Sequence, residues 1–177
     1  NIDLDIETEN ILLSNEGLIF MTAHIGNWEL LVPIMSKYKD LTLIVKEQKN
    51  LGSDRFFSEC RSLTNVSIIT KKGSREKMLN ALNNGGVLFL ASDQNAKKRG
   101  VYIDFFGKPA SFPKGAGHFH YFSEKKIVIG FCILNDNYDY DFKLKEIYLN
   151  NNYEQKDNMI VEINNIYVKL LEEEIKK

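Results

Sequence analysis

Apolar residues along this chain form short runs that alternate with amphipathic stretches. The runs are of strand length and end at turn residues, whereas the stretches between them repeat apolar residues every three or four positions. The pattern predicts strands over 17–23, 41–46, 66–70, 86–91, 101–106, 127–134 and 141–148, and helices over 28–38, 52–63, 74–84, 114–125 and 156–176. Because strands and helices alternate through the first half, we predict an α/β fold: a mostly parallel central sheet with helices on both faces.

Three polar residues lie at the ends of predicted strands and define a candidate site. In parallel sheets ligands bind outside the carboxyl ends of the strands. His24, Lys46 and Asp93 each fall at such an end. We therefore expect a functional site at this edge of the sheet.

Composition fits one globular domain over residues 1–177 and excludes some classes of function. The chain has 44% hydrophobic and 27% charged residues, and its formal net charge of −1 argues against a nucleic-acid-binding protein. The two cysteines, Cys60 and Cys132, lie in apolar surroundings without paired spacing, so we predict reduced core residues in a cytoplasmic setting. The longest apolar run, 127–134, is far shorter than the roughly 20 residues that cross a bilayer.

The stretch from His24 to Glu29 has the ingredients of a general base. In a continuous helix the two side chains would lie about 140° apart, at roughly 100° per residue. The turn signal Gly26-Asn27 between them can bring them together. A carboxylate beside a histidine fixes its tautomer and raises its basicity. The alternative is structural: Glu29 is a first-turn acid, Asn27 the N-cap and His24 a loop histidine.

A second set of motifs follows in the other half of the chain. Asp93-Gln94 comes directly after an apolar strand, the segment 105–110 reads Phe-Phe-Gly-Lys-Pro-Ala, and Gly115-Ala116-Gly117 opens a predicted helix. Together with His-Ile-Gly-Asn-Trp-Glu over 24–29, these motifs resemble, in order, the lipid A biosynthesis (late) acyltransferase family, which is related to the lysophospholipid acyltransferases. The resemblance covers about residues 16–175.

This resemblance implies a glycerolipid-acyltransferase-like fold and an O-acyl transfer. A fatty acyl chain would pass from an acyl carrier protein thioester to a hydroxyl of a lipid A precursor, with His24 as base and Glu29 as its partner. Asn27, Asp93 and Gln94 would belong to the substrate-binding part of the site, Asp93 mainly as structural support. No bound cofactor or metal is implied, since the acyl carrier protein or acyl-CoA thioester is a co-substrate.

Basic residues near the strand ends are candidates for binding anionic groups. Lys46 stands where the family usually has arginine, and Arg61 lies in the next predicted helix; each could meet an acceptor phosphate at the opening that contains His24. Two further clusters could receive an acidic acyl carrier protein, although charge runs are usually solvated faces: 71–75 with two lysines and an arginine, and Lys97-Lys98-Arg99.

The resemblance also carries expectations about location. Family members usually have a membrane helix before this region and further motifs after it, so we expect the chain to be a piece of a protein that works on the membrane surface, at the cytoplasmic face of the bacterial inner membrane, in lipopolysaccharide biosynthesis. Two alternatives remain open. One is a related glycerolipid or glycosyl-lipid acyltransferase that uses the same base on a different acceptor, with acyl carrier protein or acyl-CoA as donor. The other is a catalytically silent lipid-binding domain.

Overall fold

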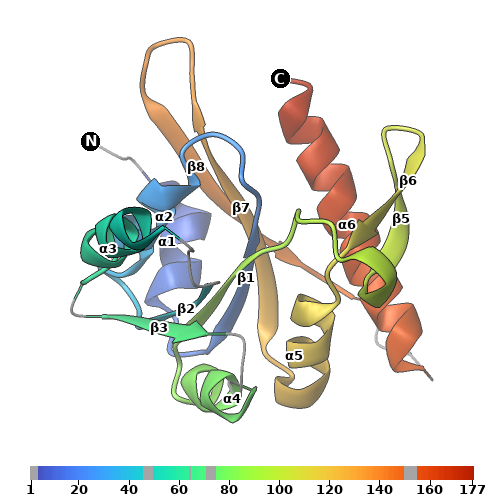
Figure 1. Cartoon of the computed structure of the whole chain (residues 1–177), viewed down its shortest axis with the longest axis horizontal. Coiled ribbons are helices and arrows are strands. Elements are labelled where there is room, and N and C mark those ends of the chain that lie inside the picture. Colours follow the sequence, from blue (N-terminus) through green and yellow to red (C-terminus); the bar gives the residue numbers. More distant parts are fainter. Residues whose placement is uncertain (1–3, 46–49, 64, 71–74, 150–154) are drawn as a thin grey trace.

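A six-stranded sheet forms the centre of the molecule (Figure 1). The computed structural model describes residues 4–45, 50–63, 65–70, 75–149 and 155–177. The strand order is β3 (Val66–Thr70), β2 (Leu41–Val45), β4 (Val87–Ala91), β1 (Leu18–Thr22), β7 (Lys126–Leu134) and β8 (Tyr140–Ile147). Neighbours are parallel except β7 and β8, which form an antiparallel hairpin at one edge. The mostly parallel sheet predicted from the sequence is confirmed.

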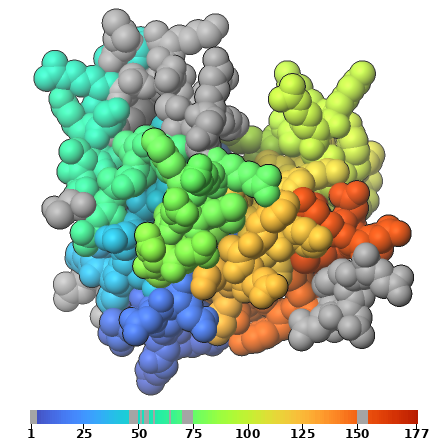
Figure 2. Space-filling view, turned by 90° about the horizontal axis from the view of Figure 1, so that it is seen from below, coloured from blue at the N-terminus to red at the C-terminus, as the bar shows by residue number. Residues whose placement is uncertain are grey.

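Helices cover both faces of this sheet, as predicted. Alternate residues of β1 point to opposite sides, so Leu18 and Phe20 pack with α1 (Ile6–Leu13) and α2 (Leu31–Met35). Ile19 and Met21 pack on the other side, with α4 (Arg75–Asn83), α5 (Gly115–Ser123) and α6 (Lys156–Ile175). Seen from below, α4 and α5 lie side by side (Figure 2). The remaining helix, α3 (Leu51–Cys60), lies between β2 and β3 in the chain.

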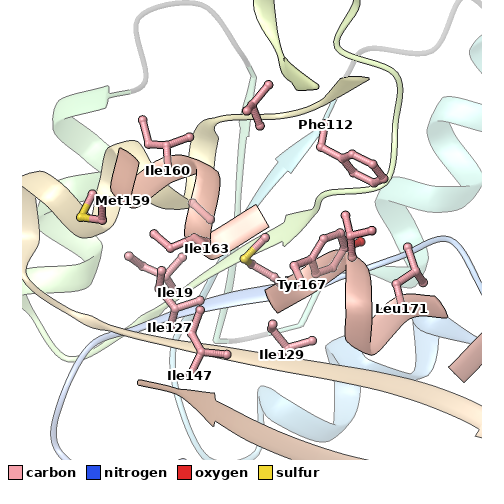
Figure 3. Packing of buried hydrophobic residues seen from close by; sticks show 14 of the residues in the cluster. Ile19, Phe112, Ile127, Ile129, Ile147, Met159, Ile160, Ile163, Tyr167 and Leu171 are labelled. Atoms are coloured by element: carbon pink, nitrogen blue, oxygen red, sulfur yellow. The ribbon is translucent and has the colours of Figure 1, made fainter. Parts of the chain in front are cut away.

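The helix α6 packs on the centre of the sheet. Its residues Ile163, Tyr167 and Leu171 lie over side chains of β1 and β7, including Ile19 and Ile129 (Figure 3). A separate two-stranded hairpin, β5 (Val101–Phe105) and β6 (Lys108–Phe112), packs against α6 on the side away from the sheet. The ring centroids of Phe112 and Tyr167 are 6.2 Å apart. The short 3-10 helix η2 (Lys97–Arg99) leads into this hairpin.

The structure differs from the prediction at three elements. The helix expected over 28–38 is a 3-10 turn, η1 (Trp28–Leu30), followed by the short α2; Pro33 lacks the N–H that would bond to the carbonyl of residue 29. The strand β6 was missed because it contains Pro109, which a two-stranded hairpin tolerates. The first helix, α1, was missed although Asp5 caps it by accepting a 2.8 Å hydrogen bond from Thr8 N.

The two cysteines have different environments. Cys132 is buried in β7, as predicted, and burial raises the pKa of its thiol to about 11. Cys60 is exposed at the end of α3, so the prediction that it is a core residue was wrong. Its neighbours in the chain, Glu59 and Arg61, are charged, as is typical of the solvated side of a helix. Over the described part of the chain, none of the helices combines the length and the apolar composition needed to cross a membrane.

Candidate active site

His24 lies directly beyond the carboxyl end of β1, where it contacts Asp93. The backbone N–H of His24 donates to Asp93 Oδ2 at 2.9 Å, and the ring Nδ1 lies 2.7 Å from Asp93 Oδ1. Asp93 follows β4, the parallel neighbour of β1, and Ser92 N donates to Thr22 O at 2.9 Å just before it. The pairing of two adjacent strands therefore brings together residues that are 69 positions apart.

This contact fixes how the histidine is presented. A carboxylate oxygen at Nδ1 requires that nitrogen to be the donor, which leaves Nε2 as the acceptor. The His24 side chain is 35% exposed and that of Asp93 21% exposed. Trp28 packs edge-on against the His24 ring, with centroids 5.0 Å apart. The ring is thus held on two sides and still reaches solvent, as a general base requires.

Glu29 is paired with Arg61, a residue of the turn after α3. Arg61 Nε donates to Glu29 Oε2 at 3.2 Å, and Arg61 Nη2 donates to Glu29 Oε1. The Arg61 guanidinium also lies over the Trp28 ring, 5.5 Å from its centroid. Within the described ranges, the carboxylate at the His24 ring is Asp93, and Glu29 binds the cation instead. The predicted His24–Glu29 pair stays a prediction.

The Gly26-Asn27 turn is fixed against β7. Gly26 has φ +57, and an added Cβ would lie 2.1 Å from Cys132 O, so a side chain does not fit there. Asn27 N donates to the same carbonyl at 2.9 Å, and its side-chain Nδ2 lies 3.4 Å from Tyr140 Oη. The Asn27 side chain makes no capping hydrogen bond to η1, so the cap in the alternative interpretation is absent.

The other predicted residues have different outcomes. Gln94 is exposed next to Asp93. Lys46 lies outside the described residues, as do Lys71 and Lys72. Asn27 lies in the turn after His24, Gln94 lies next to Asp93, and Arg61 binds Glu29. Their substrate-binding roles remain predictions.

A cavity of about 570 Å³ opens beside Asp93. Its apolar wall comes from the β5–β6 hairpin and the end of α6, and its polar side includes Lys97 and Lys98 of η2. The wall includes Phe105, Phe112, Leu171 and Ile175. The volume is typical of small-molecule sites. The lining residues include neither His24 nor Arg61, so the expected opening that His24 shares with a basic wall stays a prediction, and the cations of this cavity come from η2.

Sequence comparisons relate the chain to known acyltransferases. The sequence profile described as bacterial lipid A biosynthesis acyltransferase matches residues 2–177. The chain belongs to this family. It is also similar to the phosphatidylinositol mannoside acyltransferases of Mycobacterium tuberculosis (strain ATCC 25618 / H37Rv), with 23% identity over 109 residues, and of Mycolicibacterium smegmatis (strain ATCC 700084 / mc(2)155), with 24% over 119 residues.

These alignments are partial on both sides. They cover 59% of this chain and 34% of the M. tuberculosis protein, and 64% of this chain and 39% of the M. smegmatis protein. The aligned segment therefore spans little more than a third of the curated relatives' length.

One residue at the site of this lipid A acyltransferase family domain, Tyr167, was not predicted from the sequence. The hydroxyl of Tyr167 donates to Thr22 O at 2.9 Å, so the carbonyl at the end of β1 accepts from both Ser92 N and Tyr167. Tyr167 is fully buried; burial, together with the charge of Asp93, raises the pKa of its hydroxyl well above the usual value. It therefore stays a neutral donor. A tyrosine among the apolar positions of the last helix was its only signal.

Proposed function

We propose that this domain transfers a fatty acyl chain from an acyl carrier protein thioester to a hydroxyl of a membrane glycolipid. The observation that carries the proposal is the His24–Asp93 pair at the carboxyl edge of the sheet, next to a cavity with an apolar wall. The family supports acyl transfer onto glycolipids in general. A lipid A precursor is the acceptor that the family description favours.

The chemistry needs a base and no protein nucleophile. An alcohol has a pKa far above 7, so its proton must leave as its oxygen attacks the thioester carbonyl. His24 Nε2 takes that proton, and Asp93 stabilises the imidazolium that forms. A C–O bond forms, the C–S bond breaks, and the proton passes from His24 to the departing thiolate of the carrier.

We assign the ring partner to Asp93 and a holding role to Glu29. In this assignment Glu29 and Arg61 fix the loop that carries Trp28 against His24. The His24–Glu29 dyad remains the competing assignment, and it needs Glu29 to leave Arg61. Lys46 and Arg61 remain our candidates for binding an acceptor phosphate.

We propose where the acyl donor binds from the positive charge of η2. Lys97 and Lys98 line the cavity and Arg99 follows them, and together they suit the acidic surface of an acyl carrier protein. Acyl-CoA also carries phosphates, so a donor assay is needed to separate the two. We place the reaction at the cytoplasmic face of the inner membrane, where such donors and lipid acceptors meet. The acyl chain of the donor would occupy the apolar part of the cavity.

Two measurements test the function. Mass spectrometry of glycolipids from cells with and without the full-length protein should reveal one missing acyl chain, which identifies acceptor and chain length together. Purified full-length protein should transfer acyl groups from acyl carrier protein to that lipid, and His24→Ala should lower kcat by about 10² to 10⁴ without loss of folding. Unchanged glycolipids would overturn the proposal in favour of a silent lipid-binding domain, and full activity of folded His24→Ala would overturn the assignment of His24 as the base.

A further inference from the structure

Lys97, the first residue of η2, is a lysine in a left-handed backbone conformation. Among the described residues, the non-glycine residues with positive φ are Lys97, Phe106, Glu124 and Tyr138. Phe106 and Tyr138 lie in hairpin turns and Glu124 ends α5, and such positions often take left-handed residues. Lys97, with φ +54, lies in neither kind of position. Glycine or asparagine would adopt this conformation more easily than lysine does.

Hydrogen bonds on both sides of Lys97 fix this conformation. Asn95 Oδ1 accepts from Lys97 N at 2.8 Å, and the hydroxyl of Ser111 donates to Lys97 O at 2.6 Å. Ser111 is buried in β6, and its backbone carbonyl accepts from Ala96 N at 3.0 Å. At Gly100 an added Cβ would lie 2.2 Å from Ser111 Oγ, so the loop lies directly against β6. The backbone of Lys97 is therefore positioned by the β5–β6 hairpin.

Lys97 and Lys98 give the cavity beside Asp93 a positively charged side. Within the described ranges neither ammonium forms an ion pair. The acid among the described lining residues is Asp93, which contacts His24. A ligand in this cavity therefore meets net positive charge on one side and the apolar wall of β5, β6 and α6 on the other. Such a lining favours a ligand in which an apolar chain is joined to an anionic group.

We propose that Lys97 binds the phosphate of a pantetheine arm whose acyl chain lies against the apolar wall. Acyl carrier protein and CoA both present a thioester on such an arm, so this phosphate is common to the two donors. A lysine ammonium binds phosphate as a point charge, and a backbone that is already fixed lowers the cost of ordering it. The volume of about 570 Å³ suits one ligand of this kind. The identity of the ligand rests on the proposed function, whereas anion binding by Lys97 does not.

Two thioether ligands test the proposal without turnover. S-dodecyl-phosphopantetheine and S-dodecyl-pantetheine share the chain and the arm and differ in the phosphate, and neither can transfer an acyl group. Calorimetric titration of the purified full-length protein should show about tenfold tighter binding of the phosphorylated ligand, because a hydrogen bond between charged groups contributes about this much at an exposed site. Added salt should reduce this preference.

Variants of Lys97 separate its charge from its backbone conformation. Lys97→Asn removes the cation and introduces a residue that tolerates positive φ, so it should abolish the preference for the phosphorylated ligand without lowering the melting temperature. Its affinity for S-dodecyl-pantetheine should stay that of the wild type. Lys97→Arg should keep most of the preference. Lys108→Asn makes the same change at an exposed lysine of β6 outside the cavity lining, so it is the matched control and should bind like the wild type.

Kinetics of the full-length protein identifies the source of the phosphate. Lys97→Asn should raise KM about tenfold for each thioester donor that the protein accepts, with little change in kcat or in KM for the lipid acceptor.

Four results would overturn the proposal. They are a raised KM for the acceptor instead of the donor, an effect with acyl carrier protein but not with an accepted acyl-CoA, equal binding of the two thioethers by the wild type, and a phosphate preference that Lys97→Asn keeps or Lys108→Asn loses. Phosphate-dependent binding through Lys97 by a protein that transfers no acyl group would overturn only the proposed function.

Discussion

Replacing Asp93 with asparagine tests which carboxylate serves His24. Asparagine keeps the size of the side chain, and its Oδ1 can still accept from His24 N. Its Nδ2 then faces the ring Nδ1 and donates to it. The ring would carry its proton on Nε2, the nitrogen that must accept the proton of the substrate.

The expected loss follows from two effects. A hydrogen bond to a charged group contributes about 1.5–3 kcal/mol, which equals roughly 10- to 150-fold in rate. The reversed tautomer adds to this, so we expect Asp93→Asn to lower kcat by about 10² to 10⁴, with a small change in KM. The side chain is 21% exposed, so water can partly replace the lost contact and the lower end is the safer expectation.

The assay is acyl transfer by the full-length protein at saturating lipid acceptor. Asp136→Asn, on the exposed β7–β8 turn, is the matched control and should keep full activity. Glu29→Gln should lose less than Asp93→Asn, because Glu29 binds Arg61. A folded Asp93→Asn protein with normal kcat would refute the assignment. A larger loss in Glu29→Gln would instead establish the His24–Glu29 dyad.

Three further predictions concern the surroundings of the site. Tyr167→Phe removes the donor to Thr22 O, so kcat should fall about tenfold with little change in KM. The free energy of unfolding, measured by urea denaturation, should fall by about 1 kcal/mol. An unchanged kcat would contradict a positioning role for Tyr167. Gly26→Ala should destabilise the protein by more than about 1 kcal/mol, because its Cβ would meet Cys132 O, and equal stability of both proteins would contradict this. A thiol reagent at pH 8 should modify Cys60 quickly and Cys132 only on unfolding, because the pKa of Cys132 is raised to about 11; labelling of native Cys60→Ser would contradict it.

The sheet and the edge that carries the site could be predicted from the sequence, because alternation of strands and helices directs the strand ends to one side. The partner of His24 could not. Glu29 is near it in sequence, but Asp93 is brought to it by the adjacency of β1 and β4, which no local pattern encodes. Arg61 was predicted as a cation of the site, but its pairing with Glu29 depends on where α3 ends. Phe106 was recognised only as part of the motif over 105–110. Its positive φ of +51 comes from the turn between β5 and β6, which the sequence did not predict.

The helix α6 has a consequence for the order in which the protein forms. It donates from Tyr167 to the end of β1, lines the cavity through Leu171 and Ile175, and holds the hairpin turn through Glu172. During synthesis residues 156–175 leave the ribosome after every strand of the sheet. A nascent chain could assemble its sheet, yet its catalytic edge would stay incomplete until this helix docks. Acyl transfer should therefore begin only after this segment has been translated.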